Sequence, residues 1–237
     1  MGVYVFVNFT QNVDRLHHVA AQRLSSNIPP ILELHGSLSE VRCVSKGNSS
    51  PKETSWWEKA QTNAFGRVDR YYPTHTAKTD ADHGCGFVCS RDALQDQLTV
   101  MNPGWYEWSV RLKNEPHLSL RRNPDGDVQL EGVSYDTFSY PTCPNCGGII
   151  KPDVVFFGEN VRKTVREQAK QWVNECDALL LVGTTVATYS AYRLVRDVKE
   201  AGKPIVLLNR GPTRVDPLVD VRIGFDSASV LSHLRFT

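Results

Sequence analysis

Two cysteines stand two residues apart at Cys143 and Cys146, in a stretch that reads Cys-Pro-Asn-Cys-Gly-Gly. A Cys-x-x-Cys pair on such a turn can direct two thiolates at one metal ion, and four thiolates complete a tetrahedral zinc site. Such a zinc is structural, because no coordination position remains for a substrate. The alternative is a pair of buried thiols. No secretory signal precedes the six cysteines, so they indicate metal ligands or buried thiols rather than disulfides.

The sequence indicates the other two ligands of a zinc site less directly. Cys43 and Cys85 are separated by a long polar segment, but loop-closure entropy grows slowly with length, so both can reach one ion. Cys89 is a rival ligand to Cys85. Cys176 precedes an apolar run and is typical of a buried apolar thiol.

Two polar motifs near the start of the chain could act on a substrate. His35 follows a short apolar run and precedes Gly36, as an ordinary loop histidine or as a general base working near neutral pH. Thr10-Gln-Asn-Val-Asp14 carries amide and carboxylate groups that can bind a sugar or an amide, or that form a polar turn with a helix cap.

The C-terminal part predicts the elements that would position such groups. Residues 178–182 form a continuous apolar run, typical of a parallel strand covered on both faces. Helical spacing over 190–201, with Gly202 as a stop, predicts a helix, and 204–209 predicts the next strand. Residues 165–175 predict another helix. Together they predict a right-handed βαβ unit, whose ligands bind beyond the carboxyl ends of the strands, at 183–185 and 209–211.

The middle of the chain predicts smaller elements. Residues 91–100 predict a short amphipathic helix, broken by Asn-Pro-Gly within 101–105, and 123–127 predicts a turn. Residues 154–159, Val-Val-Phe-Phe-Gly-Glu, predict an apolar strand with an end exposed to a cleft. Residues 46–84 are polar and lack periodicity, so we expect a poorly ordered, dispensable insert.

The totals exclude several classes of function. The chain has 237 residues, 41% hydrophobic and 22% charged, with a net charge of +1. This balance points to neither a nucleic acid partner nor an acidic membrane surface. No apolar run approaches the roughly 20 residues that span a bilayer. The N-terminus shows no convincing signal or transit peptide.

Taken together, these motifs resemble those of the sirtuins, the NAD-dependent protein deacylases, over residues 10–45 and 85–230. The Val-Val-Phe-Phe-Gly-Glu strand is most similar to the class II, mitochondrial-type branch. The resemblance implies an α/β fold, an incomplete Rossmann-like parallel sheet with a small zinc-binding lobe. Residues 1–42 and 147–237 would form the NAD-binding part. Residues 43–146 would form the zinc lobe, with the insert at 46–84 as a lineage-specific insertion or a retained intron.

The resemblance also implies a role for individual residues. His35 becomes the general base on the ribose hydroxyls of NAD, and Gln11, Asn12 and Asp14 line the nicotinamide-ribose end. The remaining NAD contacts are Gly183, Thr184, Thr185, Asn209, Arg210, Ser227 and Ala228. The substrate peptide pairs by β-augmentation with Val155, Phe156, Phe157, Gly158 and Glu159. Cys85 is favoured over Cys89, so the implied zinc ligands are Cys43, Cys85, Cys143 and Cys146.

The implied reaction transfers an acyl group from a protein lysine to ADP-ribose and releases nicotinamide. The acyl oxygen attacks C1′ of the nicotinamide ribose, and His35 then activates a ribose hydroxyl to attack the resulting imidate. NAD is the co-substrate, zinc is structural, and the partner is an acylated-lysine protein. Mono-ADP-ribosyl transfer is a related possibility, and a catalytically impaired zinc-binding remnant that acts only in protein interaction is the alternative from another class.

One departure from the family bears on activity. The family's Gly-Ala-Gly-x-Ser loop and Gly-Ile-Pro-Asp-Phe-Arg segment, which hold the NAD phosphates and close over nicotinamide, do not occur in these 237 residues. The first βα unit would therefore be absent and a central strand edge unpaired. We expect this chain to bind NAD weakly and to deacylate poorly or not at all. The resemblance favours a mitochondrial location, with the cytoplasm or nucleus as alternatives.

Overall fold

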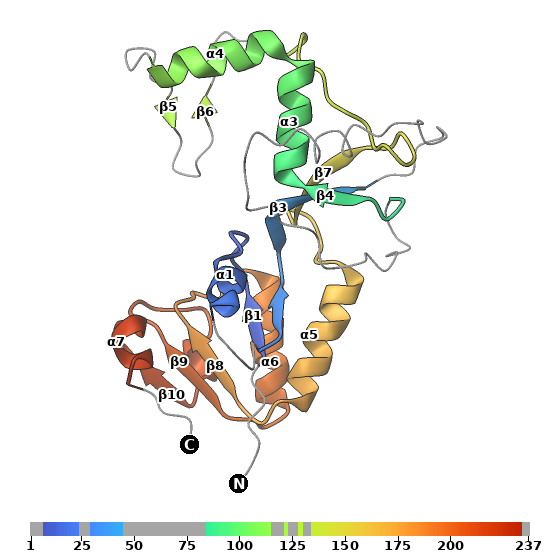
Figure 1. Cartoon of the computed structure of the whole chain (residues 1–237). Helices are drawn as coiled ribbons and strands as arrows, with labels where there is room; N and C mark the ends of the chain where they lie inside the picture. Colours follow the sequence, from blue (N-terminus) through green and yellow to red (C-terminus); the bar gives the residue numbers. More distant parts are fainter. Residues whose placement is uncertain are drawn as a thin grey trace. The chain divides into compact units, whose positions relative to one another are not determined.

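The computed structural model describes residues 7–23, 29–44, 84–114, 121–122, 128–129 and 134–233. These residues divide into two compact units, one from the segments up to Ser37 and from Val154 onward, the other from Leu38 to Asp153 (Figure 1). The assignment of NAD binding to one part and zinc binding to the other stays a prediction. The expected insert lies outside the described residues apart from Gly84, and so does the expected turn at 123–127.

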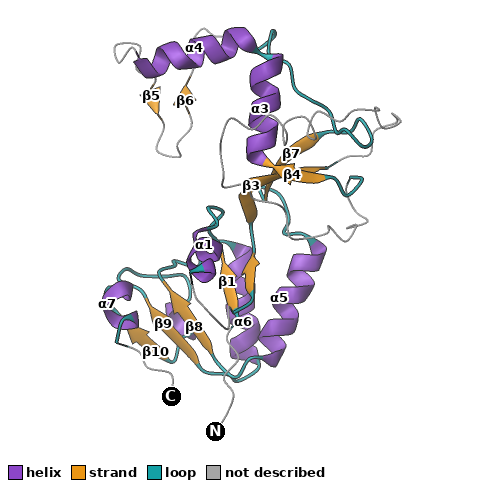
Figure 2. Cartoon of the chain, in the orientation of Figure 1, coloured by secondary structure: helices purple, strands orange, loops and turns teal. Residues whose placement is uncertain are grey.

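The first unit contains two parallel sheets. In one, β1 (Asn8–Thr10) pairs with β2 (Ile31–Glu33), so that Phe9 lies opposite Leu32. In the other, the order is β10-β9-β8, and the central strand β9 (Ile205–Leu208) pairs with β8 (Leu179–Val182) and β10 (Val221–Ile223). Figure 2 shows these strands with the helices of the same unit. The predicted α/β class with parallel strands is confirmed.

The helices of this unit lie close to their predicted positions. The predicted helices at 165–175 and 190–201 correspond to α5 (Lys163–Glu175) and α6 (Tyr189–Glu200). The differences of one or two residues at the ends are ordinary fraying. The unit also contains three shorter helices, which are α1 (Leu16–Gln22), the 3-10 helix η2 (Asp216–Leu218) and α7 (Ser227–Leu231).

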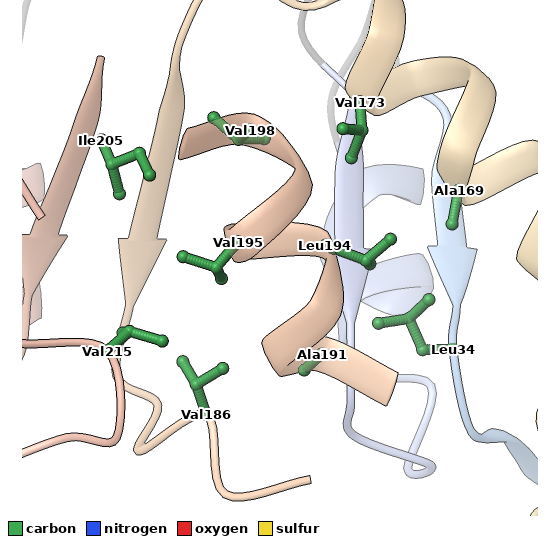
Figure 3. Packing of buried hydrophobic residues seen from close by; sticks show 10 residues of the cluster. All are labelled: Leu34, Ala169, Val173, Val186, Ala191, Leu194, Val195, Val198, Ile205 and Val215. Carbon is green, nitrogen blue, oxygen red and sulfur yellow. The ribbon is translucent and has the colours of Figure 1, made fainter. Parts of the chain in front are cut away.

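Helix α6 carries the core of the first unit. Its buried residues Ala191, Leu194, Val195 and Val198 recur at helical spacing, so they form one apolar face. In Figure 3, Val195 and Val198 lie on the side of Ile205, whereas Leu194 lies on the side of β1 and β2. Each such side chain contributes roughly 1.5–3 kcal/mol when fully buried. The helix ends at the predicted stop, Gly202, whose φ is 68°, and Lys203 N donates to Val198 O at 3.2 Å.

Strand β8 departs from its expected environment. The sequence predicts cover on both faces, but Leu180 is 45% exposed and Val182 is 37% exposed. Leu180 and Val182 lie on the same face, whereas Leu179 and Leu181, on the other face, pack against the core cluster that contains the buried residues of α6. Among the described strands, β8 pairs only with β9, so its other edge has no strand partner. An apolar run shows only that a strand can be covered on both faces, so the prediction of full cover is wrong.

The second unit is built on a three-stranded sheet of order β4-β3-β7. Strand β3 (Gly36–Cys43) begins in the first unit and pairs antiparallel with β4 (Val88–Ser90), and β7 (Ile150–Val154) completes the sheet. A short antiparallel pair joins β5 (Arg121–Arg122) and β6 (Val128–Gln129). The small core combines Val41 and Phe87 with buried cysteines.

Two consecutive helices follow β4. The first, α3 (Arg91–Met101), confirms the predicted helix, and Ser90 caps it by accepting from Ala93 N at 3.1 Å. The predicted break within 101–105 is confirmed, because α3 ends at Met101, but a second helix that was not predicted, α4 (Pro103–Asn114), begins at Pro103. Proline suits a first helical position, where its missing N–H would have no intrahelical partner.

Asn102 fixes the junction between these helices. Its side chain is buried and donates to Leu98 O and Ser139 O, each at 2.9 Å, and it accepts from Ser139 N at 2.7 Å. One amide side chain therefore bonds to three backbone atoms, which belong to two residues, and holds the junction in place.

The predicted strand at 154–159 is also wrong. Strand β7 ends at Val154, and the following residues form a turn in which Glu159 N donates to Phe156 O at 3.0 Å. The Glu159 carboxylate accepts in return from Phe156 N at 3.1 Å. Gly158 has a φ of 88°, outside the range of a strand. The apolar run therefore presents Phe156 and Phe157 to solvent rather than extending the sheet.

Candidate functional site

Four cysteine sulfurs in the second unit converge on one point. The Sγ atoms of Cys43, Cys85, Cys143 and Cys146 all lie within 4.8 Å of one another. Cys43 and Cys146 are 3.7 Å apart, and Cys85 and Cys143 are 3.5 Å apart. Tetrahedral zinc with bonds of about 2.3 Å places its sulfurs about 3.8 Å apart. The spacing and the four-thiol donor set therefore fit a closed, structural zinc site.

Three segments position these sulfurs. Cys43 ends β3, and its backbone N–H donates to Phe87 O at 2.9 Å. Cys143 and Cys146 lie on a turn in which Gly147 N donates to Cys143 O at 2.7 Å, and Cys143 N donates to Gly148 O at 2.8 Å. Next to Cys85, Gly84 has a φ of 85°, and a Cβ there would lie 2.2 Å from Cys43 O. The two ends of the segment between Val44 and Gly84 therefore meet in space.

Two of these thiols must lose a proton to bind a metal. Burial raises the pKa of Cys143 and of Cys85, so both hold their protons until a metal displaces them. Cys89 lies on β4 opposite Val41, away from the four converging sulfurs, and burial raises its pKa to about 12. The geometry thus selects Cys85 over Cys89. Cys176 packs against the core of the first unit and donates to Val173 O at 3.2 Å.

His35 is held from both ring nitrogens in the first unit. Nδ1 lies 3.3 Å from the Gln11 carbonyl oxygen, and Nε2 lies 2.9 Å from Ser190 Oγ. The backbone is fixed as well, because Val155 N donates to His35 O at 2.9 Å. The histidine follows β2 directly, at the carboxyl end of a parallel strand, which is where ligands bind in such sheets.

The Gln11 side chain joins this histidine to the loop after β8. Its amide nitrogen donates to Thr184 Oγ1 at 2.9 Å, and its amide oxygen accepts from Thr188 Oγ1 at 3.0 Å. The same loop holds Val186 at a φ of 51°, an uncommon conformation for a β-branched residue. Val186 is 1% exposed, so core packing maintains the strained backbone. Residues after β1, β2 and β8 thus meet at the start of α6.

Two predicted residues lie apart from this network. Asn12 and Asp14 are exposed on the turn between β1 and α1. Asp14 accepts from Leu16 N at 3.0 Å, and Asn12 N donates to Thr10 Oγ1 at 3.1 Å. Both contacts are local, so in this structure the two residues shape the turn. Their assignment to the nicotinamide-ribose end stays a prediction.

A cavity of about 160 Å³ lies at the carboxyl ends of β8, β9 and β10. Four residues of the predicted NAD set line it, and three further residues do so as well, giving Gly183, Leu208, Asn209, Arg210, Phe225, Asp226 and Ser227. Phe225 and Asp226 follow the third parallel strand, so the strand-end rule could have identified them. Polar groups in the lining form contacts of their own: Arg210 Nη2 lies 3.4 Å from Asp226 Oδ1, and Asn209 Nδ2 donates to Gly211 O at 2.9 Å.

The other predicted residues after these strands do not line the cavity. Thr184 bonds to Gln11, and Ala228 lies on α7. Thr185 is exposed, and its carbonyl accepts from Arg214 N at 3.1 Å. The Arg214 guanidinium lies 4.1 Å from the centre of the Tyr192 ring. These contacts anchor the loop to α6.

Comparison with known proteins identifies the family. The model of the Sir2 family matches residues 3–190. The chain belongs to the Sir2 family. This Sir2-family chain is similar to an NAD-dependent protein deacylase of Batrachochytrium dendrobatidis, with 38% identity over 96% of the chain and 61% of the relative. An NAD-dependent protein deacetylase of Xanthomonas campestris is 34% identical, with 95% and 58% covered.

Solved structures show the same fold. A Sir2 crystal structure with the inhibitor EX-527, 2′-O-acetyl-ADP-ribose and a deacetylated p53 peptide superposes with a TM-score of 0.53 and 18% identity. That match covers 96% of the Sir2-family chain and 62% of the solved chain. A Sir2 structure with a p53 peptide and NAD+ gives 0.52, also at 18% identity. The Sir2-family chain thus spans about three fifths of the length of these proteins. Within its described segments, no helix is long and apolar enough to cross a bilayer.

Proposed function

We propose that the protein is an NAD-dependent protein-lysine deacylase, with His35 as its general base. The observation that carries the proposal is the placement of His35, held at both ring nitrogens in the same unit as the cavity at the carboxyl ends of β8, β9 and β10. Support comes from the relatives, which are named NAD-dependent protein deacylases and deacetylases.

The residues of the chain divide the work between binding and proton transfer. The Gln11 carbonyl can only accept, so the hydrogen of neutral His35 belongs on Nδ1 and the basic lone pair on Nε2. NAD, when bound, supplies an electrophilic ribose carbon with nicotinamide as the leaving group. The Arg210 side chain and the Asn209 amide line the cavity and would contact polar groups of that ligand. Gln11 holds the loop after β8 against His35.

The acylated substrate would approach the turn after β7. Phe156 is 49% exposed and Phe157 is fully exposed, so the turn offers apolar contact area beside the backbone that Val155 fixes to His35. Assignment of residues 155–159 to substrate binding is part of the proposal. Zinc at the four cysteines would order the second unit and take no part in the reaction.

The test is product analysis. The purified protein, joined at its N-terminus to a glycine-rich segment of the family, is incubated with NAD and a panel of acyl-lysine peptides, and nicotinamide and free-lysine peptide are measured by mass spectrometry. We expect both products in equal amounts and their loss in His35→Ala. His17→Ala is the matched control. Because His17 is exposed, this variant should retain activity. No nicotinamide release with any peptide would refute the proposal, whereas release with ADP-ribose left on protein would select mono-ADP-ribosyl transfer.

Two finer assignments belong to the same proposal. The branch with the Val-Val-Phe-Phe-Gly-Glu segment and a mitochondrial location are both supported by the sequence resemblance alone. Fractionation of cells that express the full gene product checks the location, and detection in the cytosol or nucleus contradicts it.

A further inference from the structure

His35 belongs to a closed ring of polar contacts made by four side chains, its own included, and one backbone carbonyl. Nδ1 faces Gln11 O at 3.3 Å, and Nε2 faces Ser190 Oγ at 2.9 Å. Ser190 Oγ lies 3.3 Å from Thr188 Oγ1, which donates to the Gln11 side-chain oxygen at 3.0 Å. The ring therefore begins and ends on the same residue. Ser190 and Thr188 lie at the start of α6, more than 150 residues from His35 in the sequence.

Proton counting shows what the Ser190 hydroxyl can do. When His35 is neutral, its hydrogen is on Nδ1, and the Ser190 hydroxyl donates to the Nε2 lone pair. When His35 is protonated, Nε2–H donates to Ser190 Oγ, and the hydroxyl hydrogen turns toward Thr188 Oγ1. Thr188 directs its own hydrogen at Gln11, so its oxygen can accept in that state. Both protonation states are satisfied by the rotation of one hydroxyl.

We propose that Ser190 is the positioning residue of His35, fixing the Nδ1–H tautomer and serving the imidazole in both protonation states. Thr188 supports it by accepting the Ser190 hydroxyl hydrogen when His35 is protonated, and the Gln11 side chain orients Thr188 for this by accepting the Thr188 hydrogen. The proposal rests on the function proposed above, because a base must hold the same orientation before and after it takes a proton.

The first test does not need activity. The chain is labelled with ¹⁵N at its histidines, and His35 is assigned from the signal lost in His35→Gln. We expect the Nδ1–H tautomer in the native protein and a gain of the Nε2–H tautomer in Ser190→Ala. Ser190→Thr keeps the hydroxyl and should restore the native spectrum. Ser109→Ala is the matched control, a serine hydroxyl on helix α4 of the second unit. Alanine suits a helix, so the variants should fold.

The second test measures turnover in the same proteins, each joined to the glycine-rich segment used above. We expect kcat of Ser190→Ala to fall about tenfold, the effect of one lost hydrogen bond, with the KM for NAD unchanged and kcat restored in Ser190→Thr. If the native protein releases no nicotinamide while the spectra change as expected, the deacylase proposal fails and the role of Ser190 in holding His35 stands. If the native protein is active, an unchanged spectrum or an unchanged kcat in Ser190→Ala overturns the role of Ser190 alone.

Discussion

Replacing Cys146 by alanine should remove zinc and destabilise the second unit while the first unit keeps its stability. Cys146 supplies one of four sulfurs that lie within 4.8 Å of one another, and its Sγ is 3.7 Å from that of Cys43. Structural zinc sites contribute about 10–16 kcal/mol of binding free energy, so one of four equal ligands represents roughly 2.5–4 kcal/mol. The dissociation constant should therefore rise roughly 10²- to 10³-fold.

The stability of the second unit cannot absorb that loss. In its core cluster, the fully buried members other than cysteines are, among the described residues, Val41 and Phe87. Each contributes roughly 1.5–3 kcal/mol when buried, so their sum is similar to the share of a single zinc ligand. We therefore expect two thermal transitions in the variant, with the transition of the second unit shifted to lower temperature.

The assay combines zinc content with unfolding. Purified chains are dialysed against metal-free buffer, zinc is counted by mass spectrometry, and unfolding is followed by circular dichroism. Cys89→Ala is the matched control, because Cys89 belongs to the same cluster and is more deeply buried than Cys146, but lies outside the four converging sulfurs. It should keep one zinc per chain. Full zinc retention in Cys146→Ala, or zinc loss in Cys89→Ala alone, would refute the assignment.

Three further outcomes follow from the same unit. Gly84→Ala should cost more stability in urea than Gly202→Ala, because both have positive φ but only at Gly84 would the new Cβ lie 2.2 Å from a backbone oxygen. Equal midpoints would contradict this. Burial raises the pKa of Cys89 from 9.0 to about 12. The free energy of unfolding should therefore fall by about 1.4 kcal/mol per pH unit as the pH rises above 9. The unfolded chain loses that proton first, so Cys89→Ala should reduce the slope by this amount. Deleting residues 46–84 should retain zinc, because the two ends of the segment, beside Cys43 and beside Cys85, already lie together, and zinc loss would show that the segment is required.

Local patterns account for the elements that the sequence predicts well. Helix α6 repeats its buried residues at helical spacing and ends at Gly202, so a short window contains all the information. The zinc ligands could also be predicted from local information, because thiol ligands are rare and their chemistry leaves one rival ligand, Cys89. Tertiary geometry was needed only to exclude that rival.

Failures occur where a pattern has two physical outcomes. Asn102-Pro103-Gly104 stops one helix, but it also starts another, because proline suits a first helical position. The apolar run at 154–159 has the composition of a strand, yet the φ of 88° at Gly158 makes it a turn. The apolar run of β8 permits cover on both faces, but whether that cover exists depends on neighbours that the run does not specify.

The candidate functional site shows the same limit of prediction from local sequence patterns. The strand-end rule predicts that residues after β8 and β9 gather at one edge of the sheet, and Gly183 and Asn209 line one cavity there. The rule does not say which side chain of each loop enters the cavity. Gly183 has a φ of 58°, and the next residue, Thr184, bonds to Gln11 instead. Ser190 gives no signal in the sequence beyond a polar residue in the first turn of a helix, because its partner His35 is adjacent only after β2 and α6 have packed. The residue types thus predict which groups can do the chemistry, whereas their orientation depends on contacts between distant segments.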